Sequence, residues 1–138
     1  AGPPSLASCT RDCYAPEQRF SAEQVQTLAR GVATALEHLH GRGILHGDLY
    51  AHNLLVDGHD CRLSDFGAAS FFTPGSHQGA ALQRLESRAF GILLEELLQR
   101  CPENGLEALW QLQRRCTSST PHERPNCVEI AAFLQGCA

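Results

Sequence analysis

The feature that most constrains the fold is one long, strongly apolar stretch at residues 82–100. In a helix, its apolar side chains would cover a broad surface rather than one narrow stripe. Such a helix is stable in water only when other elements pack around it. We therefore predict a central buried helix in a mainly α fold, and its expected core residues are Leu85, Phe90, Leu93, Leu94, Leu97 and Leu98.

A second helix is predicted to begin after Ser21. Ser21 and Gln24 have the spacing of a Ser-x-x-Gln capping box, which satisfies two backbone N–H groups at a helix start. Gly41 is expected to end this helix. The residues that recur on one face are Val25, Leu28, Val32, Leu36 and Leu39.

A short hairpin is predicted between the two helices. The apolar run 54–56 ends in the turn signal Asp57-Gly58, and residues 61–64 can supply the partner strand. This hairpin would carry Asn53 and Asp65 at its two outer ends and so bring them side by side.

The rest of the sequence predicts loops and two further helices. Residues 70–79 and 118–123 are polar and are expected to be loops. Pro125 is tolerated in the first turn of a last helix. The apolar sets of the two helices are Leu106, Leu109 and Trp110, and then Val128, Ile130, Phe133 and Leu134.

Length and composition indicate one domain. The chain has 138 residues, of which 1–19 read as a linker or hinge-like lead-in and 20–138 as the folded domain. It contains no Met, so we expect it to be a segment of a longer protein. No apolar run approaches the ~20 residues of a membrane span. The net charge of −4 argues against nucleic acid or an anionic membrane as the main partner.

The seven cysteines do not predict a disulfide framework or a zinc site. Their number is odd, their spacing is irregular and no Cys-x-x-Cys pair occurs. We expect small buried side chains in a reducing cytoplasm, which predicts a cytoplasmic protein. A metal site is also not expected at the spaced histidines His40, His46, His52 and His59.

The segment from His46 to Asn53 carries the most informative chemistry, together with Asp65-Phe66-Gly67 beyond it. The spacing of Asp48, Asn53 and Asp65 is compatible with in-line phosphoryl transfer from Mg-ATP. In that chemistry one carboxylate orients an attacking hydroxyl, and amide and carboxylate oxygens bind magnesium.

Four separated segments resemble the C-terminal lobe of a eukaryotic-type protein kinase. They are the helix end at 36–46, the His-x-Asp…Asn loop with Asp-Phe-Gly, the helix at 86–97, and a closing segment at 116–134 that contains Arg124-Pro125. Their order and spacing fit the family across residues 20–138. More narrowly, His-Gly-Asp-Leu-Tyr-Ala-His-Asn and the lead-in are similar to bacterial kinases that carry leucine-rich repeats upstream.

The resemblance implies roles for individual residues. Asp48 would be the catalytic base, and Asn53 and Asp65 would hold Mg²⁺ or Mn²⁺. Leu55 matches the leucine under the adenine ring of ATP. The structural positions at the site would be His46, Phe66, Gly67, Glu86 and Arg124.

Two of these structural positions carry specific expectations. Glu86 stands where the family has Asp, and it could still accept hydrogen bonds from the catalytic loop. Arg124 matches an arginine that normally pairs with a glutamate after the activation segment.

Several positions depart from the family pattern. Gly47 replaces the Arg that binds a phosphorylated activation loop, so we expect no switch through phosphorylation of Ser70, Thr73 or Ser76. Tyr50 and the following His52 leave the acceptor type, Ser/Thr or Tyr, open. The segment 68–85 is short and contains no Ala-Pro-Glu, which puts the usual peptide-docking platform in question.

The ATP-gripping half of a kinase is missing from this sequence. It contains no Gly-x-Gly-x-x-Gly, and all eleven basic residues counted as Lys or Arg are Arg. In the family these features belong to the N-terminal lobe, so the expected partner is an upstream N-lobe. We predict the C-lobe of an ATP- and Mg-dependent protein kinase with an unknown protein substrate, inactive as an isolated fragment.

Two alternatives share parts of the pattern. Small-molecule phosphotransferases of the aminoglycoside or choline kinase type also carry His-Gly-Asp-Leu…Asn, but the Phe90-Gly91 helix and Arg124-Pro125 favour the protein-kinase branch. The other alternative is a noncatalytic pseudokinase module that serves as an interaction surface.

Overall fold

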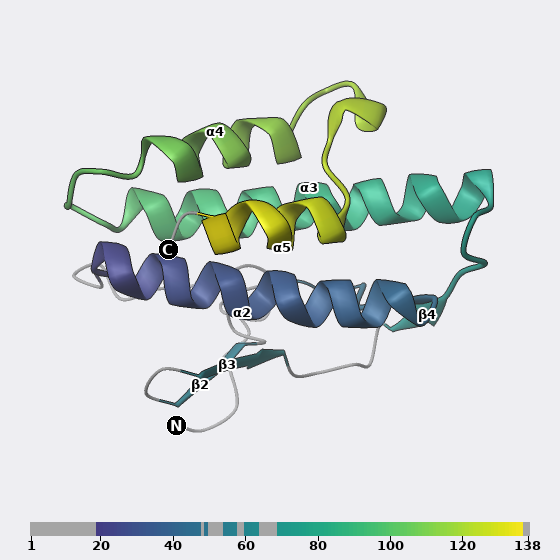
Figure 1. The fold of residues 1–138 in the computed structure, drawn as a ribbon, viewed down its shortest axis with the longest axis horizontal. Coiled ribbons are helices and arrows are strands. Elements are labelled where there is room, and N and C mark those ends of the chain that lie inside the picture. The colour runs from purple at the N-terminus through teal and green to yellow at the C-terminus, as the bar shows by residue number, and fades with distance from the viewer. Residues whose placement is uncertain (1–18, 48, 50–53, 58–59, 64–68, 137–138) are drawn as a thin grey trace, which may run out of the picture.

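The computed structural model describes residues 19–47, 49, 54–57, 60–63 and 69–136, and the described part is mainly helical (Figure 1). In chain order the elements are α2 (Ala22–Gly41), β1 (Ile44–Leu45), β2 (Leu54–Asp57), β3 (Asp60–Leu63), β4 (Ser70–Phe71), α3 (His77–Gln99), α4 (Glu107–Cys116), the 3₁₀ turn η3 (Pro121–Glu123) and α5 (Cys127–Gly136).

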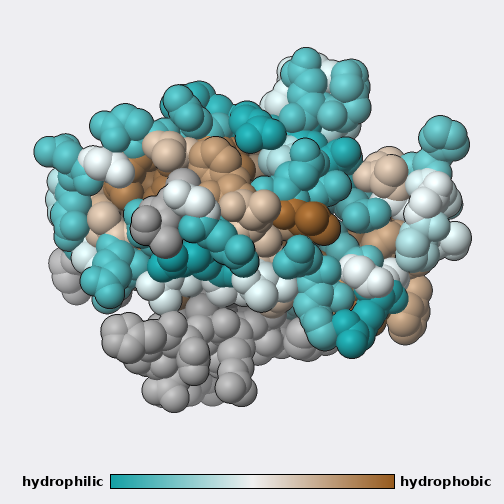
Figure 2. All heavy atoms as spheres, viewed as in Figure 1, coloured by the Kyte–Doolittle hydropathy of each residue, from teal (hydrophilic) through white to brown (hydrophobic). Residues whose placement is uncertain are grey.

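Helix α3 is the longest and packs against both α2 and α4. Helix α4 lies along α3, α5 lies along α2, and the β2–β3 hairpin lies against α2 on the side away from α4 (Figure 1). Figure 2 shows the outer result of this packing: hydrophilic residues cover most of this face, and hydrophobic residues gather along its middle.

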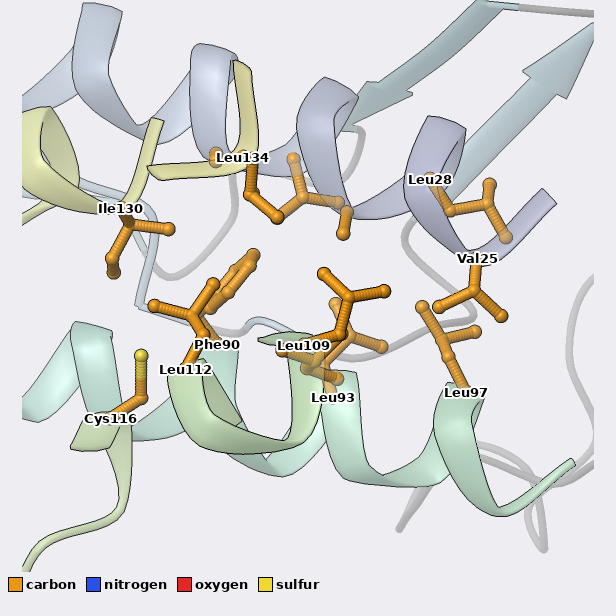
Figure 3. Packing of buried hydrophobic residues seen from close by; sticks show 14 of the residues in the cluster. Val25, Leu28, Phe90, Leu93, Leu97, Leu109, Leu112, Cys116, Ile130 and Leu134 are labelled. Carbon is orange, nitrogen blue, oxygen red and sulfur yellow. The ribbon is translucent and has the colours of Figure 1, made fainter. Parts of the chain in front are cut away.

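The predicted buried helix at residues 82–100 is confirmed as part of α3. Side chains of all four α-helices point toward one another in a single core (Figure 3). Burial of each large aliphatic side chain stabilises the fold by about 1.5–3 kcal/mol. Leu85 is the exception to the prediction, because 59% of its surface is exposed. The α3 residues that are buried as expected are Phe90, Leu93, Leu94, Leu97 and Leu98.

The start of α2 is also confirmed. The Ser21 hydroxyl accepts a hydrogen bond from the Gln24 N–H at 3.1 Å, and the Gln24 side chain accepts one from the Ser21 N–H at 2.8 Å. The helix ends at Gly41, as predicted, and Arg42 is the C-cap. Leu39 is only partly buried.

Helix α3 begins before the predicted start at Leu82. Its first residue is His77, and the Ser76 hydroxyl caps it by accepting a hydrogen bond from the Gly79 N–H at 2.9 Å. The first turn is largely exposed, so it gave no apolar period in the sequence. The predicted loop at 70–79 therefore contains a helix start and also strand β4.

The predicted hairpin is present as strands β2 and β3. They pair antiparallel, with Leu54 opposite Leu63 and Asp57 opposite Asp60. A second small sheet, which the sequence did not indicate, pairs β1 with β4 and places Ile44 opposite Phe71.

The last helix differs from the prediction at its start. Helix α5 begins at Cys127, so Pro125 precedes the helix instead of occupying its first turn. Asn126 caps it through a reciprocal pair: its side chain accepts from the Glu129 N–H at 2.9 Å, and the Glu129 carboxylate accepts from the Asn126 N–H at 3.0 Å. Val128 was wrongly placed in the core, since 59% of it is exposed.

Three cysteines in the described residues are free thiols: Cys101, Cys116 and Cys127. Cys116 and Cys127 are buried in the core, as predicted for small apolar side chains. Burial raises the pKa of the Cys116 thiol to about 12. Burial, with smaller contributions from neighbours that include Glu86, also raises the pKa of Cys127.

A search for membrane-spanning helices in the described part of the chain finds none of sufficient length and apolarity.

Helix α3 lies close to the end of α4 at Gly91. A Cβ atom at this position would lie 2.7 Å from the Cys116 Cβ and 2.8 Å from the Thr117 Cγ2. We expect Gly91→Ala to lower the free energy of unfolding by about 1–3 kcal/mol, because the helices must separate to fit the methyl group. Urea denaturation measures this.

Gly41→Ala is the matched control. A Cβ at Gly41 would meet no atom within 4 Å. The control should leave stability unchanged or raise it by up to about 1 kcal/mol. Equal unfolding midpoints for the two variants would contradict the close approach at Gly91.

Candidate functional site

The buried carboxylate of Glu86 on α3 organises the site. Its Oε1 accepts a hydrogen bond from the His40 Nε2 at 2.9 Å and another from the His46 N–H at 2.9 Å. Its Oε2 accepts one from the Gly47 N–H at 2.8 Å. Glu86 therefore joins the end of α2 and the loop after β1 to the central helix.

These three donors determine the charge state of Glu86. Burial by itself would raise the pKa of this carboxyl group. The hydrogen bonds from His40, Gly47 and His46, together with the positive potential of His40, outweigh burial, and the pKa lies below its ordinary value. The side chain is therefore a carboxylate at neutral pH.

His40 has a role that the sequence did not reveal. Its ring packs edge-to-face on Phe72, with 6.0 Å between ring centroids, while Nε2 donates to Glu86. Its Nδ1 is buried without a hydrogen-bond partner in the described part of the chain. The available signal was position: His40 follows Leu36 by four residues on the apolar face of α2.

The loop is held on both sides of position 48. Gly47 donates its N–H to Glu86, and Leu49 is 6% exposed and belongs to the hydrophobic core. Gly47 has a φ of 87°, a conformation that a glycine adopts without strain. An arginine at this position, as in the family pattern, would be strained in this backbone.

The predicted site residues divide into two sets. His46, Glu86 and Arg124 are described and buried. For Leu55 only the strand backbone is described, and it pairs with Arg62. The predicted site residues that lie outside the described part of the chain are Asp48, Asn53, Asp65, Phe66 and Gly67.

Arg124 is held by backbone carbonyl groups. Its Nε donates to the Ser118 carbonyl at 2.8 Å, and its guanidinium also donates to the Arg84 carbonyl at 3.2 Å. The Arg84 side chain donates in return to the Arg124 carbonyl. Among the described residues no glutamate pairs with Arg124, so its observed function is to fix the segment before α5 to α3.

A groove of about 580 Å³ lies between the loop and α3. We call it the loop–α3 groove. One side is lined by Leu45, Gly47, Leu49 and Ser70, and the other by Leu82, Leu85, Glu86, Arg88, Ala89 and Ile92.

No metal cluster is found in the part of the chain that the structure describes, where no three His, Cys, Asp or Glu side chains are grouped to hold an ion. The predicted ligands Asn53 and Asp65 lie outside that part.

The fold and this loop geometry are accompanied by a family match. The family model of the protein kinase domain matches residues 6–92, which is more than half of the chain. The chain therefore belongs to the protein kinase domain family. The match ends within α3 and does not include α4 or α5.

Individual relatives are named as kinases or as a kinase-like protein. The chain is 43% identical over 60 residues, 43% of its length, to a probable serine/threonine-protein kinase of Arabidopsis thaliana, and this covers 10% of that protein. It is 33% identical over 97 residues, 64% of its length, to a PX domain-containing protein kinase-like protein of Mus musculus, covering 17% of that protein.

A bacterial relative gives a similar result. The chain is 43% identical over 67 residues, 49% of its length, to the serine/threonine-protein kinase AfsK of Streptomyces coelicolor, covering 8% of that protein. The matched segments thus span less than a fifth of each of these three relatives.

Replacement of Glu86 tests the anchoring of the loop. We expect Glu86→Gln to lower the free energy of unfolding at neutral pH by about 2–4 kcal/mol, because the amide N–H₂ would face hydrogen-bond donors. The folded pKa of Glu86 is depressed, so its contribution is present above about pH 4.3, the usual unfolded pKa of Glu, and is lost as the pH falls through the folded value.

The measurement is urea denaturation of both proteins between about pH 7 and pH 3. The stability difference should shrink on acidification. Glu107→Gln, at an exposed position of α4, is the control and should cost under about 1 kcal/mol. A difference that stays constant with pH would contradict the assignment.

Proposed function

We propose that this chain forms the C-terminal lobe of an ATP- and Mg-dependent protein kinase, which transfers a phosphoryl group to a Ser, Thr or Tyr hydroxyl of a protein substrate. The observation that carries the proposal is that both sequence neighbours of position 48 are held by the fold. Gly47 is bound to Glu86, and Leu49 is packed in the core. Phosphoryl transfer depends mainly on positioning and electrostatic stabilisation, and anchored neighbours favour a well-positioned base.

Asp48 is the proposed base. Its two sequence neighbours are held by different parts of the fold, one by a hydrogen bond to α3 and one by core burial. A carboxylate at this position would orient the acceptor hydroxyl and accept its proton.

Asn53 and Asp65 are the proposed metal ligands. Their amide and carboxylate oxygens are of the kind that Mg²⁺ or Mn²⁺ prefers. The pairing of Leu54 with Leu63 supports the assignment, because Asn53 directly precedes Leu54 and Asp65 follows Leu63 by two residues. When bound, the metal neutralises charge that develops on the transferred group. Leu55 is the proposed contact to the adenine ring.

The proposal also requires an upstream N-lobe. The sequence has no lysine and no glycine-rich phosphate loop, so it lacks side chains that grip the nucleotide in the family. We therefore propose that the isolated chain is inactive. Leucine-rich repeats in the longer protein and a cytoplasmic location remain predictions from the sequence.

Removal of the proposed base tests the activity. In the full-length protein, Asp48→Asn should lower kcat by roughly 100- to 10,000-fold, because the amide cannot accept the proton. The thermal unfolding temperature should change little. The measurement is phosphate transfer from labelled ATP to generic protein acceptors, with Glu107→Gln as the control.

The same assay separates the alternatives. Unchanged transfer by Asp48→Asn would contradict the proposed base. Transfer to choline or an aminoglycoside, but not to proteins, would identify a small-molecule phosphotransferase. A protein that transfers no phosphate, and whose cellular function survives Asp48→Asn, would be a pseudokinase module.

Nucleotide binding tests the need for the N-lobe. Titration calorimetry of the isolated chain with Mg-ATP should show no micromolar binding, because the interactions with the upper lobe are missing. The full-length protein, titrated under the same conditions, is the positive control. Micromolar affinity of the isolated chain would refute the division into two required lobes.

A further inference from the structure

One wall of the loop–α3 groove is an apolar stripe on the surface of α3. Leu82, Leu85, Ala89 and Ile92 follow one another at intervals of three or four residues, so they share a face of the helix. Leu85 is mostly exposed, and the other three are partly exposed. This stripe extends over about 15 Å at the rise of an α-helix, the length of four or five extended peptide residues.

The groove is lined by both sequence neighbours of the proposed base. Gly47 and Leu49, the sequence neighbours of Asp48, both line it. A peptide that occupies the groove would therefore pass next to the residue that we assign to the acceptor hydroxyl.

Arg88 provides the available positive charge of the groove. The charged side chains that line it are Glu86 and Arg88. Glu86 is 6% exposed, and both of its oxygens already accept hydrogen bonds from His40, His46 and Gly47. Arg88 is exposed, and no hydrogen bond or ion pair joins it to any other described residue.

Gly47, which lines the groove, adds no second cation beside Arg88, because it has no side chain where the family pattern has an arginine. A ligand in the groove thus meets apolar walls, a buried carboxylate whose two oxygens already accept hydrogen bonds, and one free guanidinium. This combination is complementary to a peptide that carries apolar and acidic side chains.

We propose that Arg88 is a specificity residue, which selects protein acceptor segments with an Asp or Glu side chain close to the acceptor hydroxyl and an apolar side chain beside it. This inference rests on the proposed protein kinase function and defines its substrate class. The apolar stripe of α3 binds the apolar side chain, and Arg88 pairs with the acidic one. An exposed ion pair of this kind changes affinity by roughly 2- to 5-fold, and salt screens it.

Peptide binding to this chain tests the inference without requiring activity. Three short fluorescein-labelled peptides share a central serine and a flanking leucine, and differ only in carrying glutamate, glutamine or arginine at the remaining flanking positions. Fluorescence anisotropy at low salt should show the glutamate peptide binding roughly 2- to 5-fold more tightly than the glutamine peptide. High salt should remove this preference.

Variants of the arginine give the matched comparison. Arg88→Gln should abolish the preference for glutamate, and Arg88→Glu should make the arginine peptide the preferred one. Arg114→Glu, a charge reversal at an exposed position of α4, should leave the order unchanged. Circular dichroism verifies that all variants keep their helical content.

The outcomes separate this inference from the proposed function. Equal binding of all peptides, absence of peptide binding, or an order that Arg88→Glu does not alter would overturn the specificity role. Phosphate transfer by the full-length protein that ignores Arg88 would overturn it while leaving the kinase function in place. Charge-selective binding that depends on Arg88, without any transfer, would support the groove and reject the enzyme.

Discussion

The carboxylate of Glu86 connects the parts of this chain that no local interaction could hold together. It receives the ring of His40 from the end of α2 and two backbone N–H groups from the loop that follows β1. The carboxylate gives each of these donors a hydrogen-bond acceptor. Burial of its charge would be unfavourable without them. The central helix therefore helps to determine where His46 and Gly47 lie, and their N–H groups in turn stabilise the buried carboxylate of α3.

Local signals made much of the fold predictable. The capping box at Ser21, the antiparallel pair of hairpin strands and the apolar periods of the helices depend on residues close in sequence, and all of these are present in the described residues. The exposed first turn of α3 had no period to reveal it. The pairing of β1 with β4 and the carbonyl partners of Arg124 depend on segments that meet only in the folded chain.

In the site, too, some features were predictable from the sequence and others depend on the folded chain. The motif indicated which residues could perform phosphoryl transfer, and the family match supports a protein kinase. The motif could not indicate that His40 would complete the hydrogen bonding of Glu86, or that Arg88 would line a groove beside the loop. The connection from β4 to α3 is short, and the side of α3 that carries Arg88 is accessible. The groove on this side can be recognised only from the folded structure, because it forms where the helix lies against the residues after β1.

The two buried thiols have a further consequence. Cys116 lies at the close contact of α4 with α3, and Cys127 begins α5. Alkylating reagents react with thiolates, so the raised pKa values and burial of both groups make them inert in the folded protein. They become reactive only when α4 or α5 separates from the core. The chain thus contains its own chemical reporters of local opening, and their labelling rates would distinguish fraying of the C-terminal helices from loss of the whole domain.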